Sequence, residues 1–187
     1  MFESSTDEMR FREAFDDYFD AITRYCLRRL PQSNANDAVA SVFVVAWRKI
    51  DKMPEGDETL PWLYGVARNE VRTFRRSQRR SAALRVKLSG EPSYPVAGPE
   101  AVVIRNDDQA QLIRALKTLG SADQEILRLR AYENLSVNQV AVVLGCTPDA
   151  AKKRCSRATR RLRDAVDRSS RRRAPTGSRA IPEGGDG

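Results

Sequence analysis

The feature that most constrains this chain is a run of three short helix patterns within residues 121–166. Ser121 with Gln124, and Ser136 with Gln139, have the spacing of a capping box, in which two side chains satisfy the free amides at a helix start. Each pair precedes an apolar run of helical period. The spacing therefore predicts two short helices, each with a defined start, followed by a third.

The turn before the third helix carries its own signals. Gly145 stands where a helix exit favours a left-handed residue, and Thr147 and Pro148 suit the cap and the first position of the next helix. Two helices joined by a glycine-bearing turn, the second of them basic, are typical of a DNA-binding helix-turn-helix. The basic residues of that second helix are Lys152, Lys153, Arg154, Arg157, Arg160, Arg161 and Arg163. Its expected apolar seam is Leu144, Ala151, Cys155, Ala158 and Leu162.

The overall charge agrees with a polyanionic partner. The 187 residues carry a formal net charge of +8, with a pI of about 9.8. There is no histidine, which removes the commonest metal ligand and general base, so neither a cofactor nor a metal is expected. Three scattered cysteines argue against a disulfide framework, and Cys26 and Cys155 fall on apolar helical faces that indicate core positions. Without a signal-peptide or membrane-span pattern, the expected location is cytoplasmic.

The N-terminal half contains three further helix patterns after residues 1–9, which look frayed. The stripe from Phe11 to Leu30 is rich in aromatic residues and predicts a helix that buries them in a core. A second helix is expected from Asn36 to Ile50, with Asp37, Ser41 and Val44 on its exposed face and Arg48 near its end, where a cation suits the helix dipole. The apolar Val44 on that face hints at a partner surface.

A third helix is expected to open at Pro61 and to be strongly basic. Only Glu70 opposes its arginines, whereas a solvated face usually mixes signs, so this helix predicts a second contact with phosphate. The arginines are Arg68, Arg72, Arg75, Arg76, Arg79 and Arg80. Trp62 is expected to pack against the second helix rather than stack on bases.

These patterns predict an all-α chain of two small helical domains joined by a flexible linker. The expected parts are a helical domain at 10–80, a linker at 81–107 rich in Gly, Pro and Ser, a helix-turn-helix domain at 108–168, and a disordered basic tail at 169–187.

In the order and spacing of its motifs the chain resembles a bacterial RNA polymerase sigma factor of the extracytoplasmic function (ECF, group IV) type of the sigma-70 family. The run Pro61–Asn69 with its arginines is similar to regions 2.3 and 2.4, Asn34–Asp37 with Ala46–Arg48 to region 2.2, and Leu119–Leu162 to region 4. The second helix departs from the family by carrying Ala38, Ala40 and Ser41, at positions that normally engage the polymerase.

The resemblance implies a non-enzymatic subunit that binds core RNA polymerase through its largest subunits and starts transcription at promoters. It also implies control by an anti-sigma factor. Expected contacts with a melted −10 element, besides the loop Met53–Thr59, are Arg68, Asn69, Arg72, Thr73, Arg75 and Arg76. Expected contacts with a duplex −35 element are Lys152, Lys153, Arg154, Ser156, Arg157 and Arg160. Expected contacts with core polymerase are Asp37, Ser41, Val44 and Arg48. The acidic residues expected to mimic RNA in the polymerase cleft are Glu91, Glu100, Asp107 and Asp108.

Two other classes of protein remain open at this point. A stand-alone regulator would bind a palindromic operator as a dimer, and would normally carry a ligand pocket or phosphoacceptor in its first domain. A nucleic-acid enzyme would need clustered carboxylates near the basic helices. Asp16, Asp17 and Asp20 are clustered, but on a helix that looks structural.

Overall fold

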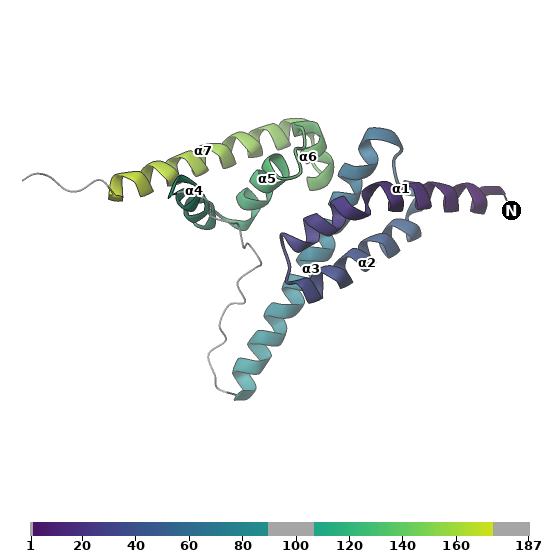
Figure 1. Cartoon of the computed structure of the whole chain (residues 1–187), viewed down its shortest axis with the longest axis horizontal. Coiled ribbons are helices and arrows are strands. Elements are labelled where there is room, and N and C mark those ends of the chain that lie inside the picture. The colour runs from purple at the N-terminus through teal and green to yellow at the C-terminus, as the bar shows by residue number, and fades with distance from the viewer. Residues whose placement is uncertain (1, 90–106, 174–187) are drawn as a thin grey trace, which may run out of the picture.

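The computed structural model describes residues 2–89 and 107–173, which form seven α-helices and two short 3₁₀ turns (Figure 1). The first unit contains α1 (Phe2–Leu27), α2 (Gln32–Arg48), η1 (Ile50–Lys52), η2 (Gly56–Glu58) and α3 (Thr59–Ser89). The second contains α4 (Asp107–Lys117), α5 (Ser121–Ala131), α6 (Val137–Leu144) and α7 (Pro148–Arg173). No strand occurs in these ranges, so the all-α prediction is confirmed.

The first unit is a three-helix bundle whose core forms where α1, α2 and α3 meet. The buried side chains recur at helical spacing on each element, as an amphipathic bundle requires. Fully or almost fully buried members are Ile22, Tyr25, Cys26, Leu30, Val39, Val42, Phe43, Ala46, Leu63, Ala67 and Val71. Trp62 packs at the edge of this core, as expected.

The aromatic stripe of α1 is only partly buried, which corrects the prediction that all of it is core. Phe15 and Phe19 are 37% and 39% exposed. The face of α1 that enters the bundle is centred on Ile22, Tyr25 and Cys26, so these two rings fall on its flank. There they pack on each other, with centroids 5.0 Å apart, at the surface of the bundle.

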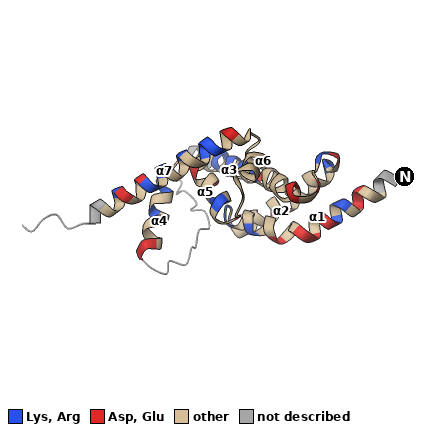
Figure 2. Ribbon diagram, turned by 90° about the horizontal axis from the view of Figure 1, so that it is seen from above, with Lys and Arg blue, Asp and Glu red and all other residues tan. Residues whose placement is uncertain are grey.

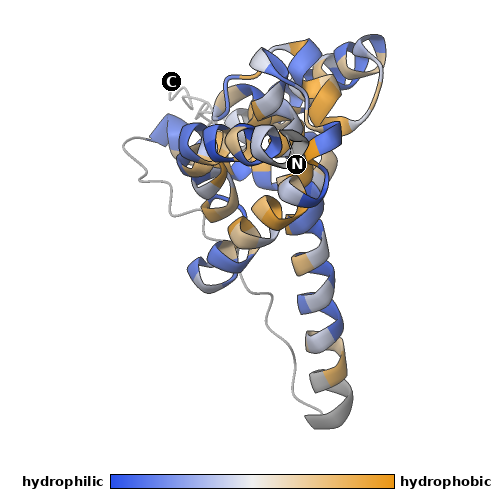
Figure 3. Cartoon of the chain, turned by 90° about the vertical axis from the view of Figure 1, so that its right-hand side faces the viewer, coloured by the Kyte–Doolittle hydropathy of each residue, from blue (hydrophilic) through white to orange (hydrophobic). Residues whose placement is uncertain are grey.

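Three helices are longer than the sequence pattern predicted. α1 begins at Phe2, although residues 1–9 were expected to fray, and α7 continues to Arg173, although the tail was expected from residue 169. α3 continues to Ser89, so the linker does not begin at residue 81 (Figure 3). Residues 81–89 contain neither glycine nor proline, and Gly90 is the first breaker, so the helix has no local reason to stop earlier. The linker and tail residues at 90–106 and 174–187, Glu91 and Glu100 among them, lie outside the described residues.

The turns of the second unit confirm most of the capping pattern. Ser136 and Gln139 form a reciprocal capping box at α6, and Gly145 ends that helix with φ of 62° in the left-handed region. The box expected at Ser121 is wrong, because α5 is capped by Gly120 and the Gln124 side chain donates to the Leu119 carbonyl instead. A local pattern fixed the helix start to within one residue but not the identity of its cap.

The two units pack against each other through α6 and α3 (Figure 1). Leu129, Leu135, Val140 and Val143 of the second unit belong to the same continuous buried cluster as the core of the first. The two helices are in contact at Gly65, where an added Cβ would lie at ordinary van der Waals distance, 3.6 Å, from the Val143 carbonyl oxygen. The described residues therefore form one closed arrangement and not two separate bodies.

Candidate nucleic-acid interface

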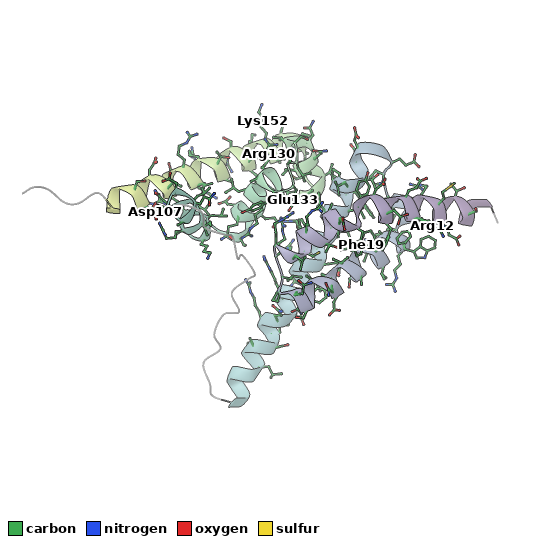
Figure 4. All side chains as sticks on the ribbon, in the orientation of Figure 1. Arg12, Phe19, Asp107, Arg130, Glu133 and Lys152 are labelled. Atoms are coloured by element: carbon green, nitrogen blue, oxygen red, sulfur yellow. The ribbon has the colours of Figure 1, made fainter. Side chains whose placement is uncertain are left out.

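α7 carries a row of basic residues that is exposed because the opposite face of the helix is buried. Ala151, Ala158 and Ala165 recur every seven residues and are almost fully buried against the rest of the second unit. The helix start is fixed because the Thr147 hydroxyl accepts from the Ala150 amide at 3.3 Å. All six residues expected to read duplex DNA are consequently exposed, namely Lys152, Lys153, Arg154, Ser156, Arg157 and Arg160. Lys152 projects from the outer side of α7 (Figure 4).

One basic residue of α7 has a structural partner. Arg161 donates from Nη1 to Asp123 Oδ2 of α5 at 2.7 Å, and this pair joins the two helices at the surface. Its charge is thus already balanced within the protein. The exposed face of α7 also carries Lys153, Arg157 and Arg160, which are spaced four and three residues apart. Contacts with phosphates and base edges require cations that are exposed in this way.

The arginines of α3 form the second basic surface, and they border a cavity of about 360 Å³ between the two units. Figure 2 shows how densely lysine and arginine follow α3 and the first half of α7. The cavity is lined from α3 by Arg68, Arg72, Arg75, Arg76 and Arg79, and from the second unit by Ser121, Ala122 and Glu125. Asn69 and Thr73 are exposed on α3 outside this lining.

Arg75 has a role that the sequence did not indicate. It is half-buried, and its Nη2 donates to the Arg29 carbonyl at 2.9 Å. Burial lowers the pKa of this guanidinium, and the nearby Arg128 and Arg29 lower it further while Glu125 opposes them. Arg75 therefore belongs at least in part to the junction between the units, and its expected contact with DNA stays a prediction.

The loop before α3 is held in place by the first helix. Arg10 donates from Nη2 to the Met53 carbonyl at 2.8 Å, and Met53 and Thr59 are buried at either end of the loop. The Thr59 hydroxyl donates to the Pro54 carbonyl at 2.9 Å. The exposed side chains between them are Glu55, Asp57 and Glu58. Because these are acidic, the loop is suited to accept hydrogen bonds from bases and not to bind phosphates.

Comparison with known proteins assigns both halves. Residues 14–81 match the family model for Sigma-70 region 2, and residues 109–162 match that for Sigma-70, region 4. The chain belongs to the sigma-70 family. It is 29% identical to the RNA polymerase sigma factor NccH of Alcaligenes xylosoxydans xylosoxydans over 71% of this chain and 73% of that one. It is 26% identical to the sigma factor CnrH of Cupriavidus metallidurans, over 75% and 78%.

A solved structure supports the same assignment. The sigma factor RpoE of Bartonella quintana, in complex with the anti-sigma factor NepR, matches with a TM-score of 0.57 and 27% identity, over 84% of this chain and 97% of that one. Among the relatives are proteins named ECF RNA polymerase sigma factors. The chain is a sigma factor of the ECF type, and its units are region 2 and region 4.

Region 2 of this sigma factor has an exposed apolar surface formed by α1 and α2. Trp47 and Val44 of α2 are 43% and 50% exposed, and the Trp47 ring lies 5.3 Å from that of Phe11 on α1. A shallow cavity of about 650 Å³ there is bordered by Glu8, Phe11, Arg12, Phe15, Asp16 and Trp47. The exposed positions of α1 were missed because their spacing also fits a core stripe.

The expected polymerase contacts include Val44 of this surface. Asp37, Val44 and Arg48 are exposed and Ser41 is half-exposed, and their spacing of four, three and four residues places them on one face of α2. Ala38, one of the three residues expected to depart from the family pattern, is fully buried. Of the three residues, only Ala40 and Ser41 therefore contribute to the accessible surface of α2.

The junction of regions 2 and 4 holds a buried ion-pair cluster that sequence reasoning missed. Arg29, whose side chain is 0% exposed, pairs with Glu125 at 3.0 Å and with Glu133 at 3.0 Å. Arg28 also pairs with Glu133, and the Tyr25 hydroxyl donates to Glu125 at 2.7 Å. Glu133 lies where region 4 faces region 2 (Figure 4). No sequence spacing could reveal this cluster, because its partners are about a hundred residues apart.

The cluster changes the proton affinities of its members. Burial by itself raises the pKa of Glu125, but the Arg29 charge and its hydrogen bonds outweigh that effect and hold the pKa below the usual carboxyl range. Burial raises the pKa of the Tyr25 phenol, which keeps this hydroxyl protonated as a donor. The ion pair of Arg29 and Glu125 is therefore charged near neutral pH even though it is enclosed.

Two features are missing from residues 2–89 and 107–173, the part of the chain that the structure describes. No helix among them is both long and apolar enough to cross a bilayer. Within the same ranges no three acidic, cysteine or histidine side chains gather so as to hold a metal ion, and Asp16, Asp17 and Asp20 are no exception.

Proposed function

We propose that this sigma factor binds core RNA polymerase, directs it to promoters by contacts with −10 and −35 elements, and starts transcription without catalysing a reaction itself. The observation that carries the proposal is that one chain presents two unlike basic surfaces, on α3 and α7, each in the half that matches the corresponding sigma region. A dimeric regulator needs one DNA-binding surface in each protomer, because its operator repeats the same half-site. A protein that reads two unlike promoter elements needs two different surfaces in one chain.

Each of the two basic surfaces serves one promoter element. The exposed cations of α7 serve a duplex −35 element, where Lys or Arg bonded to guanine gives about 1–3 kcal/mol of discrimination. The α3 residues Arg68, Asn69, Arg72, Thr73, Arg75 and Arg76, with the acidic loop Met53–Thr59, serve a melted −10 element. Extruding a base costs a few kcal/mol, which contacts to the exposed base must offset.

The surface of α2 that carries Val44 and Arg48 serves the polymerase, together with the neighbouring aromatic residues of α1. Apolar side chains exposed beside charged ones are typical of a protein–protein interface. The residues at 90–106 connect the regions. An anti-sigma factor is proposed as the regulator, on the similarity to the Bartonella protein solved with NepR. The expected location is the cytoplasm, where polymerase works.

The test begins with purified chain and sigma-free core RNA polymerase. Co-elution in size-exclusion chromatography, followed by abortive transcription on a pool of promoter sequences, is expected to give promoter-specific initiation. A matched pool in which only the −35 half is randomised identifies the bases that α7 reads. Absence of co-elution, with tight binding of the free protein to a palindromic duplex, would overturn the proposal in favour of a stand-alone regulator.

A further inference from the structure

The cavity between α3 and α5 has a wall made of cations. One face of α3 supplies the arginines of its lining, which are Arg68, Arg72, Arg75, Arg76 and Arg79. Within residues 2–89 and 107–173, all of them except Arg75 lack an ion pair or a side-chain hydrogen bond. Like charges three or four residues apart on a helix repel each other, so this row lowers the stability of α3 unless an anion offsets it.

The carboxylate in the lining does not offset this charge. Glu125 already accepts three hydrogen bonds from Arg29 and one from the Tyr25 hydroxyl. Burial lowers the pKa of the Arg75 guanidinium, and the charge of Arg128 lowers it further, as a positive field does. The lining therefore carries an excess of positive charge that an anion from solution would balance.

The opposite wall is the start of α5, which favours anions for a different reason. Ser121 and Ala122 are the first residues of this helix, and its N-cap, Gly120, has no side chain that could accept from their amides. Gln124 does not cap the helix either, because its side chain donates to the Leu119 carbonyl. Free amides and the helix dipole attract negative charge. Region 2 and region 4 thus each face the cavity with groups that bind anions.

The size and length of the cavity select the kind of anion. Its volume of about 360 Å³ falls within the range of small-molecule sites, about 300–1,000 Å³. The arginine row from Arg68 to Arg79 extends about 17 Å along α3, since each residue of a helix rises 1.5 Å. A guanidinium binds phosphate through two parallel hydrogen bonds. A single phosphate reaches few of these arginines, whereas a chain of linked phosphates reaches several.

The lining offers phosphate contacts but no stacking surface for a base. Among the residues that line the cavity, Tyr25 alone is aromatic, and its ring is fully buried with the Arg29 guanidinium 3.5 Å from its centre. A base bound there would lack the aromatic face on which bases commonly stack. The cavity is therefore suited to a phosphate chain, whether that chain is free or belongs to a nucleotide.

We propose that this cavity binds an oligophosphate chain, held by the α3 arginines on one side and by the start of α5 on the other. The chain is inorganic polyphosphate or the triphosphate of a nucleotide. A bound chain covers Arg72 and Arg76, so it competes with a melted −10 strand for them. That consequence rests on the proposed function, whereas the binding itself does not.

Calorimetric titration of the full chain with inorganic tripolyphosphate at 150 mM salt tests the binding directly. One-to-one binding is expected, and ATP is expected to bind within threefold of tripolyphosphate. Orthophosphate should bind at least tenfold more weakly, because it reaches fewer arginines. Absence of tripolyphosphate binding would overturn the proposal. Equal binding of orthophosphate would indicate an adventitious ion only, and ATP binding ten times more tightly would contradict recognition of the phosphates alone.

Two neighbouring arginines distinguish the cavity from general charge. Arg79 lines the cavity and Arg80 does not, although both are exposed on α3. Arg79→Gln is expected to weaken tripolyphosphate binding at least fivefold, and Arg80→Gln less than twofold. Equal losses in the two variants would overturn the proposal, because binding would then depend on net charge.

A second pair of variants tests the wall from region 4. Ser121→Glu keeps every arginine but places a carboxylate in the lining, and it is expected to weaken tripolyphosphate binding at least tenfold. Lys117→Gln changes the net charge equally at an exposed position outside the lining, and less than a twofold effect is expected. Unchanged binding by Ser121→Glu would place the ligand on the open face of α3 and overturn the site.

These titrations contain neither polymerase nor promoter. Failure of the wild-type chain to start promoter-specific transcription would count against the proposed function, and failure to bind tripolyphosphate would count against this site alone.

Discussion

Replacing Arg157 should change the salt dependence of promoter binding by an amount that can be worked out beforehand. Arg157 is exposed, one helical turn beyond Lys153 on α7. A phosphate contact contributes about 0.9 to the slope of log affinity against log salt. Over a fourfold rise in salt, from 50 to 200 mM, one such contact therefore accounts for about a 3.5-fold loss of affinity.

We expect Arg157→Ala, as holoenzyme, to bind a promoter duplex more weakly than wild type. The ratio of wild-type to variant affinity should decrease about 3.5-fold between 50 and 200 mM salt. Fluorescence anisotropy of a labelled duplex at four salt concentrations measures this slope. Arg161→Ala is the matched control on the same helix, because its guanidinium is held by Asp123 at 2.7 Å. An equal change of slope in both variants, or none in either, would refute the assignment of Arg157 to the DNA-facing side.

Three further outcomes are expected. Leu63→Ala, at a fully buried position, should lower the free energy of unfolding by about 2–5 kcal/mol in urea titration, and a loss below 1 kcal/mol would mean that the core there is not close-packed. Val44→Asp should weaken core-polymerase binding tenfold or more without changing the melting temperature, whereas Leu112→Asp, at an exposed position of α4, should leave that binding unchanged; equal effects would contradict a local interface. Burial raises the pKa of the Cys26 thiol to about 12, so at pH 8 it should resist alkylation while Cys146 is labelled; equal labelling rates by mass spectrometry would show that the core opens freely.

The local parts of the site could be predicted because they depend on neighbours in the chain. The capping box at Ser136, the left-handed Gly145 and the Thr147 cap each involve residues at most four positions apart, and the structure has all three. The direction of the α7 cations follows in turn, since three alanines at a seven-residue spacing bury the opposite face. Helical period likewise placed Asp37, Ser41 and Val44 on one accessible face of α2.

The predictions that were wrong concern helix ends and the depth of a stripe. No glycine or proline stands between Arg80 and Ser89, so α3 continues through these residues. The prediction assigned them to the linker because of the composition of the residues that follow. Phe15 and Phe19 have the period of core residues, but which positions of a broad apolar stripe enter the core depends on where the partner helices lie. The spacing of Ser121 and Gln124 predicted Ser121 as the N-cap of α5, but the N-cap is Gly120.

What the sequence determined by itself was therefore the set of helices, the two basic faces and the family, since these depend on period, local capping and motif order. The packing of region 4 on region 2 was decided only by the tertiary structure. The pairing of Arg29 with Glu125 and Glu133 joins residues 96 and 104 positions apart, and the spacing of charges along a chain carries no information about pairs at that separation. The same contact packs Val143 against Gly65, so this junction exists only where both regions are already folded.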